Sequence, residues 1–261
     1  MSWLRALGDT GILVSAVGLG TVKFGRDRGV RYARPFTLPD ERSASSLLAR
    51  AQELGINLID TAPAYGESEQ RLGRLLKGQR QSWVLCTKVG ETFLDGESHY
   101  DFSPEHTRAS VERSLTRLGT DTLDVVLVHS NGDDLDIIER PGTLDALETL
   151  KRKGLIRAIG MSTKTVPGGI AAAKACDVVM LTYNLQQQEE QAVLDACHHL
   201  GRAALVKKAL ASGHLAGGDT DQLQAGMDLV FSHPGATAAV IGTIDPRHLE
   251  ADVNAARRAL A

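Results

Sequence analysis

Four side chains have the types that proton transfer to a carbonyl group requires. Asp60 ends a short apolar run, Tyr65 follows it five residues later, and Lys88 and His129 each end a further apolar run. A lysine ammonium beside a phenol favours the phenolate and so lowers the pKa of the phenol. A carboxylate such as Asp60 is the partner that a buried ammonium needs. These residues therefore predict that Tyr65 is a proton donor near neutral pH.

Reduction of a carbonyl group needs a source of hydride as well as a proton donor. No side chain donates hydride, so a bound cofactor must supply it. A neutral His129 would donate a hydrogen bond to the substrate carbonyl and orient it. The simpler interpretation is that any strand must end in something polar. That interpretation accounts for one such position, but not for Asp60, Lys88 and His129 together.

The elements that must position these residues alternate along the chain. A hairpin is expected at residues 4–15, because a cluster of Asp and Gly separates two short apolar runs. Ser103 and Pro104 predict a helix start, with serine as the N-cap and proline at the first helical position. Strands are expected at residues 17–21, 56–60, 83–88, 123–128, 158–161, 178–182, 203–206 and 238–241, and further helices at 39–54, 67–77, 142–153, 168–175, 188–200 and 246–259.

This alternation favours an α/β fold with a closed parallel barrel. Strands alternating with helices indicate right-handed βαβ units, and eight such units in 261 residues fit one (β/α)8 TIM barrel. We expect a single domain over residues 1–261, with residues 1–16 as a hairpin cap. An open, doubly wound sheet would require a third glycine and a helix after Gly18-Leu19-Gly20. In a barrel, polar residues at the carboxyl ends of strands meet at one face.

The bulk composition narrows the partners. The net charge is −3 without a basic run, so nucleic acid and anionic membranes are not expected partners. No apolar run approaches the roughly 18 residues of a membrane span. Three widely spaced cysteines predict reduced thiols and a cytoplasmic protein. The expected partner is a small carbonyl or alcohol, and the composition leaves the oligomeric state open.

Several stretches resemble the aldo-keto reductases, which are NAD(P)(H)-dependent oxidoreductases on a (β/α)8 barrel with an N-terminal hairpin. The stretch from Asp60 to Glu69 is similar to the most specific signature of that family. The stretch from Gly154 to Ser162 is similar to the signature of its fifth strand. Residues 7–15 resemble the opening hairpin, and residues 18–21 resemble the first strand. The resemblance covers essentially the whole chain.

The resemblance implies roles for particular residues. Asp60, Tyr65, Lys88 and His129 match the catalytic tetrad, with Tyr65 as the general acid in reduction and the base in oxidation. Ser162 matches the residue that binds the nicotinamide carboxamide. The resemblance also implies further cofactor contacts. Gly20 and Thr21 would line the floor of the site, and Lys207, Lys208, Leu210 and Ser212 would lie along the pyrophosphate. Gly242 and Thr243 would lie near the adenosine phosphate, and Arg247 and His248 near the 2′-phosphate of NADP.

Other positions depart from the family pattern. Met180 stands where glutamine commonly holds the carboxamide, and Lys207 replaces the aromatic residue that stacks on the nicotinamide. Ala251 and Asp252 replace a Glu-Asn pair that grips adenine, and Thr163 replaces a common asparagine. The segment between residues 208 and 238 is short for the family, which predicts a trimmed seventh helix and a more open substrate pocket. Arg247 and His248, which by the resemblance meet the 2′-phosphate, favour NADP(H), whereas these departures keep NAD(H) possible.

The sequence thus predicts an NADP(H)-preferring oxidoreductase that interconverts aldehydes or ketones with alcohols. One alternative is a sugar (aldose) 1-dehydrogenase that acts oxidatively. Another is a non-catalytic NADP(H)-binding regulatory subunit, which the intact tetrad disfavours. A metal-dependent barrel hydrolase would need clustered ligands at strand ends, where only His129 qualifies. The acidic run at residues 133–136 is expected to be a solvated loop.

Overall fold

Eight parallel strands close into a barrel, as the sequence predicted. The computed structural model describes residues 2–30, 35–140, 142–211 and 220–261. Around the barrel the strands follow the order β10, β11, β12, β3, β4, β5, β8, β9, and each neighbouring pair is parallel. The barrel strands are β3 (Val17–Gly20), β4 (Leu58–Asp60), β5 (Val84–Val89), β8 (Leu123–His129), β9 (Ile156–Ser162), β10 (Val178–Thr182), β11 (Ala203–Lys207) and β12 (Ala238–Ile241).

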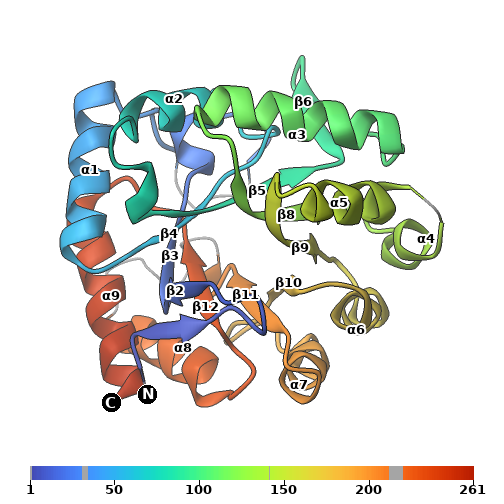
Figure 1. Ribbon diagram of the computed structural model, residues 1–261. Coiled ribbons are helices and arrows are strands. Elements are labelled where there is room, and N and C mark those ends of the chain that lie inside the picture. The colour runs from blue at the N-terminus through green and yellow to red at the C-terminus, as the bar shows by residue number, and fades with distance from the viewer. Residues whose placement is uncertain (1, 31–34, 141, 212–219) are drawn as a thin grey trace.

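Helices surround the strands on the outside of the barrel (Figure 1). The predicted start of α3 is confirmed, because the Ser103 side chain accepts a hydrogen bond from the backbone N–H of His106, and Gly119 ends the helix in the left-handed region. The helices are α1 (Glu41–Glu53), α2 (Ser68–Leu75), α3 (Pro104–Leu118), α4 (Asp134–Glu139), α5 (Thr143–Arg152), α6 (Val166–Ala175), α7 (Gln191–His199), α8 (Thr220–Ser232) and α9 (Pro246–Leu260), with short 3-10 turns η1 (Val22–Phe24) and η2 (Arg80–Ser82).

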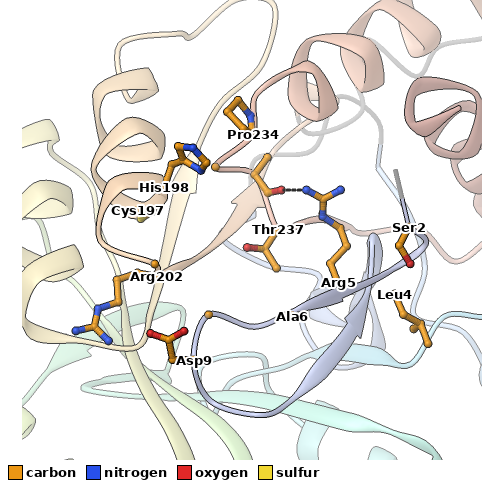
Figure 2. A pocket seen from close by; sticks show the side chains of 14 residues that line it. Ser2, Leu4, Arg5, Ala6, Asp9, Cys197, His198, Arg202, Pro234 and Thr237 are labelled. Carbon is orange, nitrogen blue, oxygen red and sulfur yellow. Dashed lines mark hydrogen bonds between the residues drawn. The ribbon is translucent and has the colours of Figure 1, made fainter.

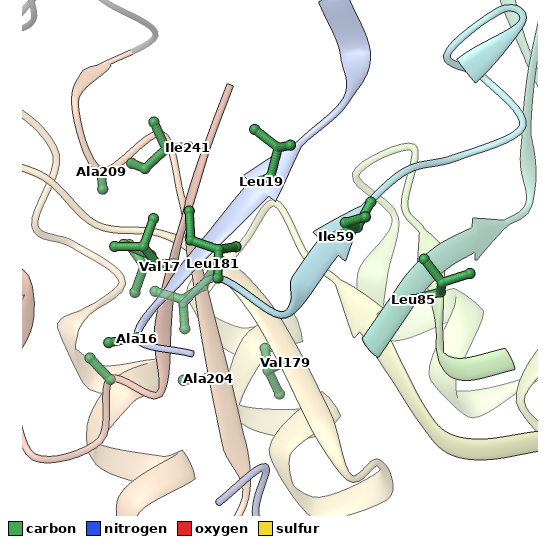
Figure 3. Close-up of a cluster of buried hydrophobic side chains, with 14 of the residues drawn as sticks. Ala16, Val17, Leu19, Ile59, Leu85, Val179, Leu181, Ala204, Ala209 and Ile241 are labelled. Atoms are coloured by element: carbon green, nitrogen blue, oxygen red, sulfur yellow. The ribbon is translucent and has the colours of Figure 1, made fainter. Parts of the chain in front are cut away.

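Two apolar cores hold the barrel, one on each side of its wall. Side chains alternate along a strand, so Leu19, Ile59 and Leu85 point outward to the helices (Figure 3). Leu58 and Cys86, one position away, point into the barrel with the inward side chains of the other strands. Because both faces of the strands are covered, they consist almost entirely of buried residues.

The N-terminal hairpin closes one end of the barrel. Its strands β1 (Leu4–Ala6) and β2 (Leu13–Ser15) pair antiparallel. Leu7, Ile12 and Val14 are fully or almost fully buried and belong to the core inside the barrel. The hairpin therefore plugs the amino-terminal end of the barrel, and the carboxyl ends of the strands remain for chemistry.

A second hairpin lies between Lys88 and Ser103. Strands β6 (Glu91–Leu94) and β7 (Glu97–Tyr100) pair antiparallel. Both Asp95 and Gly96 have positive φ at the turn, and Asp-Gly is the pair that a two-residue hairpin turn favours. The turn signal was present in the sequence, but the exposed strands lack a clear apolar alternation.

The expectation of a solvated loop at residues 133–136 was wrong. These residues begin the short helix α4, and Asp134 is buried. Its carboxylate accepts hydrogen bonds from the backbone N–H groups of Lys164 and Thr165 and from the hydroxyl of Thr165. This acid therefore fastens α4 to the loop before α6.

Candidate active site

The two-residue repeat of the strands brings the predicted polar residues to one mouth of the barrel. Asp60 follows Leu58 by two positions, Lys88 follows Cys86, and His129 follows Leu127. The earlier residue of each pair lines the barrel interior. The later residue therefore also points inward, one layer closer to the carboxyl ends of the strands. Since β4, β5 and β8 are neighbours in the barrel, the three polar side chains lie side by side at the carboxyl ends of the strands.

Lys88 is the centre of this group. Its ammonium is buried, donates to Oδ1 of Asp60 at 2.5 Å and to the carbonyl oxygen of Thr61 at 2.9 Å, and lies 4.8 Å from the ring centroid of Tyr65. Burial by itself lowers the pKa of the ammonium, but the charges of Asp60, Tyr65 and Cys86 outweigh it and raise that pKa above its ordinary value. Lys88 is therefore a fixed positive charge beneath the phenol.

Two glycines hold the loop that carries Tyr65. A Cβ atom on Gly25, after η1, would overlap the carbonyl oxygen of Tyr65 and the backbone nitrogen of Ser68. Gly66 has a φ of +60°, and a Cβ there would overlap the carbonyl oxygen of Gly25. The two backbones can approach this closely only because neither residue has a side chain, and this approach positions Tyr65 next to Lys88.

His129 completes the group. Its ring meets the Tyr65 ring edge-on, with 6.2 Å between the centroids and an interplanar angle of 86°. Its Nδ1 atom lies 2.6 Å from Oε2 of Glu91, a residue on β6 that sequence reasoning missed. Burial lowers the pKa of the imidazole and Lys88 acts in the same direction, whereas Glu91 raises it; the net pKa is below the ordinary value. The structure thus brings all four predicted residues together.

Ser162 and Lys207 lie beside this group at the mouth. Ser162 pairs in register with His129 across β8 and β9. The Lys207 ammonium donates to Oγ of Ser162 at 2.9 Å and to the carbonyl oxygen of Thr163 at 2.8 Å. Burial lowers the pKa of Lys207 to about 8. Lys207 is therefore bound to the serine predicted to hold a carboxamide, an arrangement that its position in the sequence did not indicate.

The other predicted cofactor residues lie on the neighbouring arc formed by β11, β12 and β3. Thr21 is fully buried, and its hydroxyl donates to the carbonyl oxygen of Asp60 at 2.9 Å. Lys208 is exposed, with a φ of +56°. Ser212 lies outside the described residues. Gly20 is the last residue of β3, and the others follow the ends of β11 or β12 or lie in the first turn of α9: Leu210, Gly242, Thr243, Arg247 and His248.

The amino-terminal end of α9 has the chemistry of an anion site. Arg247 and His248 are exposed in the first turn of the helix, where backbone N–H groups and the helix dipole also favour anions. Asp245 caps the helix and contacts the Arg247 guanidinium at 2.9 Å. Hydrogen bonding to Arg247 lowers the pKa of Asp245 to about 2. Lys208 is exposed directly after β11, the strand that pairs with β12 in the barrel. Exposed cations are the side chains that phosphates bind, but in this structure the Arg247 guanidinium already pairs with Asp245.

A cavity of about 550 Å³ lies at the other end of the barrel (Figure 2). It lies between the N-terminal hairpin and the segment that leads into β12, and Nη2 of Arg5 donates across it to the carbonyl oxygen of Ala236 at 2.9 Å. Asp9 and Arg202 also line it. Asp60, Tyr65, Lys88 and His129 do not line this cavity, so it is distinct from the group that they form.

In the part of the chain that the structure describes, no cluster of three or more His, Cys, Asp or Glu side chains is arranged to hold a metal ion. None of the helices in this described part is both long enough and apolar enough to cross a membrane.

Comparisons with known proteins agree with this geometry. Residues 16–229 match the family model described as "Aldo/keto reductase family". A crystal structure of a Pseudomonas aeruginosa protein assigned to the aldo-keto reductases is 53% identical, with a TM-score of 0.91, over 99% of this chain and 96% of that one. L-galactose dehydrogenase of Arabidopsis thaliana is 39% identical over 61% of this chain. The NADH-specific methylglyoxal reductase of Escherichia coli is 31% identical over 81% of this chain.

The extent of these matches differs. The alignment spans 48% of the length of the Arabidopsis enzyme and 68% of the length of the Escherichia coli enzyme. The chain thus spans about half the length of the first of these curated relatives, whereas it spans nearly all of the Pseudomonas structure.

Proposed function

Since the chain belongs to the aldo/keto reductase family, we propose that it is an NADP(H)-preferring oxidoreductase that interconverts aldehydes or ketones with alcohols, with Tyr65 as the general acid and base. The observation that carries the proposal is the buried Lys88 ammonium, held 2.5 Å from the Asp60 carboxylate and 4.8 Å from the Tyr65 ring centroid. A fixed positive charge at this place stabilises a phenolate and so eases loss of the Tyr65 proton.

The residues at the mouth of the barrel have different roles in the proposed reaction. A bound NADP(H) supplies or accepts hydride, which side chains cannot do. In reduction, Tyr65 gives its proton to the carbonyl oxygen, and the resulting phenolate is stabilised by Lys88. Asp60 keeps Lys88 charged and in place. In oxidation, the Tyr65 phenolate takes the proton of the alcohol. His129 lies against Tyr65 and orients the oxygen atom that reacts.

The preference for NADP(H) rests on the exposed cations at the start of α9. We expect that Arg247→Ala weakens NADPH binding about tenfold, because it removes one charge-assisted contact to a 2′-phosphate, and that NADH binding stays unchanged. Fluorescence titration with both nucleotides measures the two dissociation constants. Arg258→Ala, near the other end of the same helix, is the matched control. Equal weakening for NADPH and NADH would contradict a 2′-phosphate contact at Arg247.

A second candidate activity is oxidation of an aldose at its first carbon, because the Arabidopsis relative is a dehydrogenase of the sugar L-galactose. Initial rates with aldehydes plus NADPH and with aldoses plus NADP⁺ separate the two. We expect the higher kcat/KM with an aldehyde and NADPH. A higher value with an aldose would make the protein a sugar 1-dehydrogenase. No turnover with either pair would contradict the proposed function.

The proposal also includes a cytoplasmic location. Cys86, Cys176 and Cys197 are free thiols and are buried. Unpaired cysteines persist in reducing compartments, so thiol usage supports this part of the proposal.

A further inference from the structure

Glu91 is a charged residue of the mouth that the proposed reaction has not used. It is buried at the start of β6, and its Oε2 atom lies 2.6 Å from Nδ1 of His129. Its Oε1 atom accepts from the Ser98 hydroxyl at 2.6 Å and lies 3.7 Å from Nη1 of Arg26. Burial by itself raises the pKa of Glu91, but His129, Ser98 and Arg26 outweigh it and lower that pKa to about 2. Glu91 is therefore a carboxylate at neutral pH.

A carboxylate at this distance constrains the protons of the imidazole ring. A carboxylate can only accept, so a hydrogen between Oε2 and Nδ1 must belong to Nδ1. Nδ1 makes no hydrogen bond of regular geometry among the described residues, so its 2.6 Å approach to Oε2 is an ion-pair contact, and a bare Nδ1 there would set its lone pair against the carboxylate. In a neutral imidazole only one nitrogen carries hydrogen, and the other is an acceptor. A neutral His129 with its hydrogen on Nδ1 therefore presents the lone pair of Nε2, and Nε2 becomes a donor only when the ring is protonated twice.

The position of Glu91 is fixed from several elements. The Arg26 side chain donates to the carbonyl oxygen of Ala64, next to Tyr65, at 3.1 Å, and its guanidinium lies 3.4 Å from the ring centroid of Phe93 on β6. The loop of η1, the Tyr65 loop and the hairpin β6–β7 therefore meet around the carboxylate. The other charges that act on the imidazole are the ammonium groups of Lys88 on β5 and Lys207 on β11, and both oppose protonation.

We propose that Glu91 is a positioning residue that keeps a hydrogen on Nδ1 of His129, so that the neutral ring accepts a hydrogen bond from an alcohol substrate through Nε2. Reduction of a carbonyl then requires a second proton on the ring, which Glu91 stabilises as an ion pair. This inference rests on the proposed oxidoreductase function. It makes His129 an acceptor in the oxidative direction and a donor in the reductive direction, with pH deciding between the two states.

The pH profiles of the Glu91→Gln variant test the inference. In the wild type, oxidation declines as the pH falls through the pKa of His129, and reduction declines as the pH rises through it. Glutamine removes the charge that stabilises the imidazolium and so lowers that pKa. We expect the pH at which oxidation declines and the pH at which reduction declines, the two limbs of the profiles, both to fall by about 1–3 units. Glu91→Asp keeps the charge, and its limbs should stay near those of the wild type even if the rate falls.

Glu97→Gln is the matched control, because Glu97 is exposed on the partner strand of the same hairpin. Its profiles should coincide with those of the wild type. A merely structural role for Glu91 would lower the rates of Glu91→Gln without moving either limb, and that result would overturn the inference.

Nitrogen-15 NMR of the imidazole rings gives a readout that does not depend on turnover. The His129 resonances are identified by their loss in His129→Gln. We expect the hydrogen of the neutral ring on Nδ1 in the wild type and on both nitrogens, in exchange, in Glu91→Leu, because leucine removes the acceptor whereas a glutamine oxygen would keep one. A neutral wild-type ring with its hydrogen on Nε2 would overturn the inference. If no carbonyl or alcohol is turned over, the proposed function fails, while NMR still decides the state of His129.

Discussion

Tyr65→Phe is expected to lower kcat by about 10²–10⁴-fold, the usual contribution of a positioned proton donor. Phenylalanine keeps the ring that lies 4.8 Å from the Lys88 ammonium and edge-on to His129, so the packing of the mouth should survive. Only the hydroxyl that exchanges the proton is lost. The dissociation constant of the nucleotide cofactor should therefore stay unchanged. Steady-state rates at saturating substrate and fluorescence titration of the cofactor measure the two quantities.

Tyr183→Phe provides the matched control for this experiment. Tyr183 is buried next to the end of β10, and its hydroxyl lies 3.4 Å from Oε1 of Gln191, which is a long contact. The same chemical change there should leave turnover near that of the wild type. If Tyr65→Phe kept more than a tenth of the wild-type kcat, another group would have to deliver the proton. The role assigned to Tyr65 would then fail.

The sequence was sufficient for the barrel and for the meeting of the tetrad, for one physical reason. Each barrel strand is buried on both faces, so it forms an apolar run that ends where the chain reaches the mouth. Asp60, Lys88 and His129 each terminate such a run, and a closed parallel barrel brings the ends of its strands to one face. Strand ends were misplaced by one or two residues, as at β5, which continues to Val89.

The surroundings of the tetrad could not be predicted in the same way. Glu91 reaches His129 only because a hairpin folds back over the mouth, and neither residue carries a local signal of the other. The contact between Lys207 and Ser162 joins β11 to β9 across β10, so it depends on the curvature of the barrel. Such contacts are set by closure of the sheet, not by spacing along the chain.

Lys88→Met is expected to lower the free energy of unfolding by about 3–5 kcal/mol and to abolish turnover. The variant leaves the Asp60 carboxylate buried without its cation, and breaking a buried ion pair on one side has a cost of this size. Both side chains are almost fully buried, so water cannot replace the lost partner. Denaturant unfolding measures the stability, and an unfolding free energy like that of the wild type would show that Asp60 does not depend on Lys88.

The double variant Asp60→Leu/Lys88→Met separates stability from catalysis. Replacing both partners of a buried ion pair with apolar side chains is often neutral or stabilising, so we expect this variant to regain most of the stability that Lys88→Met loses. Turnover should stay absent, because no charge remains to stabilise the Tyr65 phenolate. Recovery of activity with stability would mean that the pair serves folding alone. Stability without activity would mean that the barrel tolerates a buried charge pair at this place because the chemistry of Tyr65 requires it.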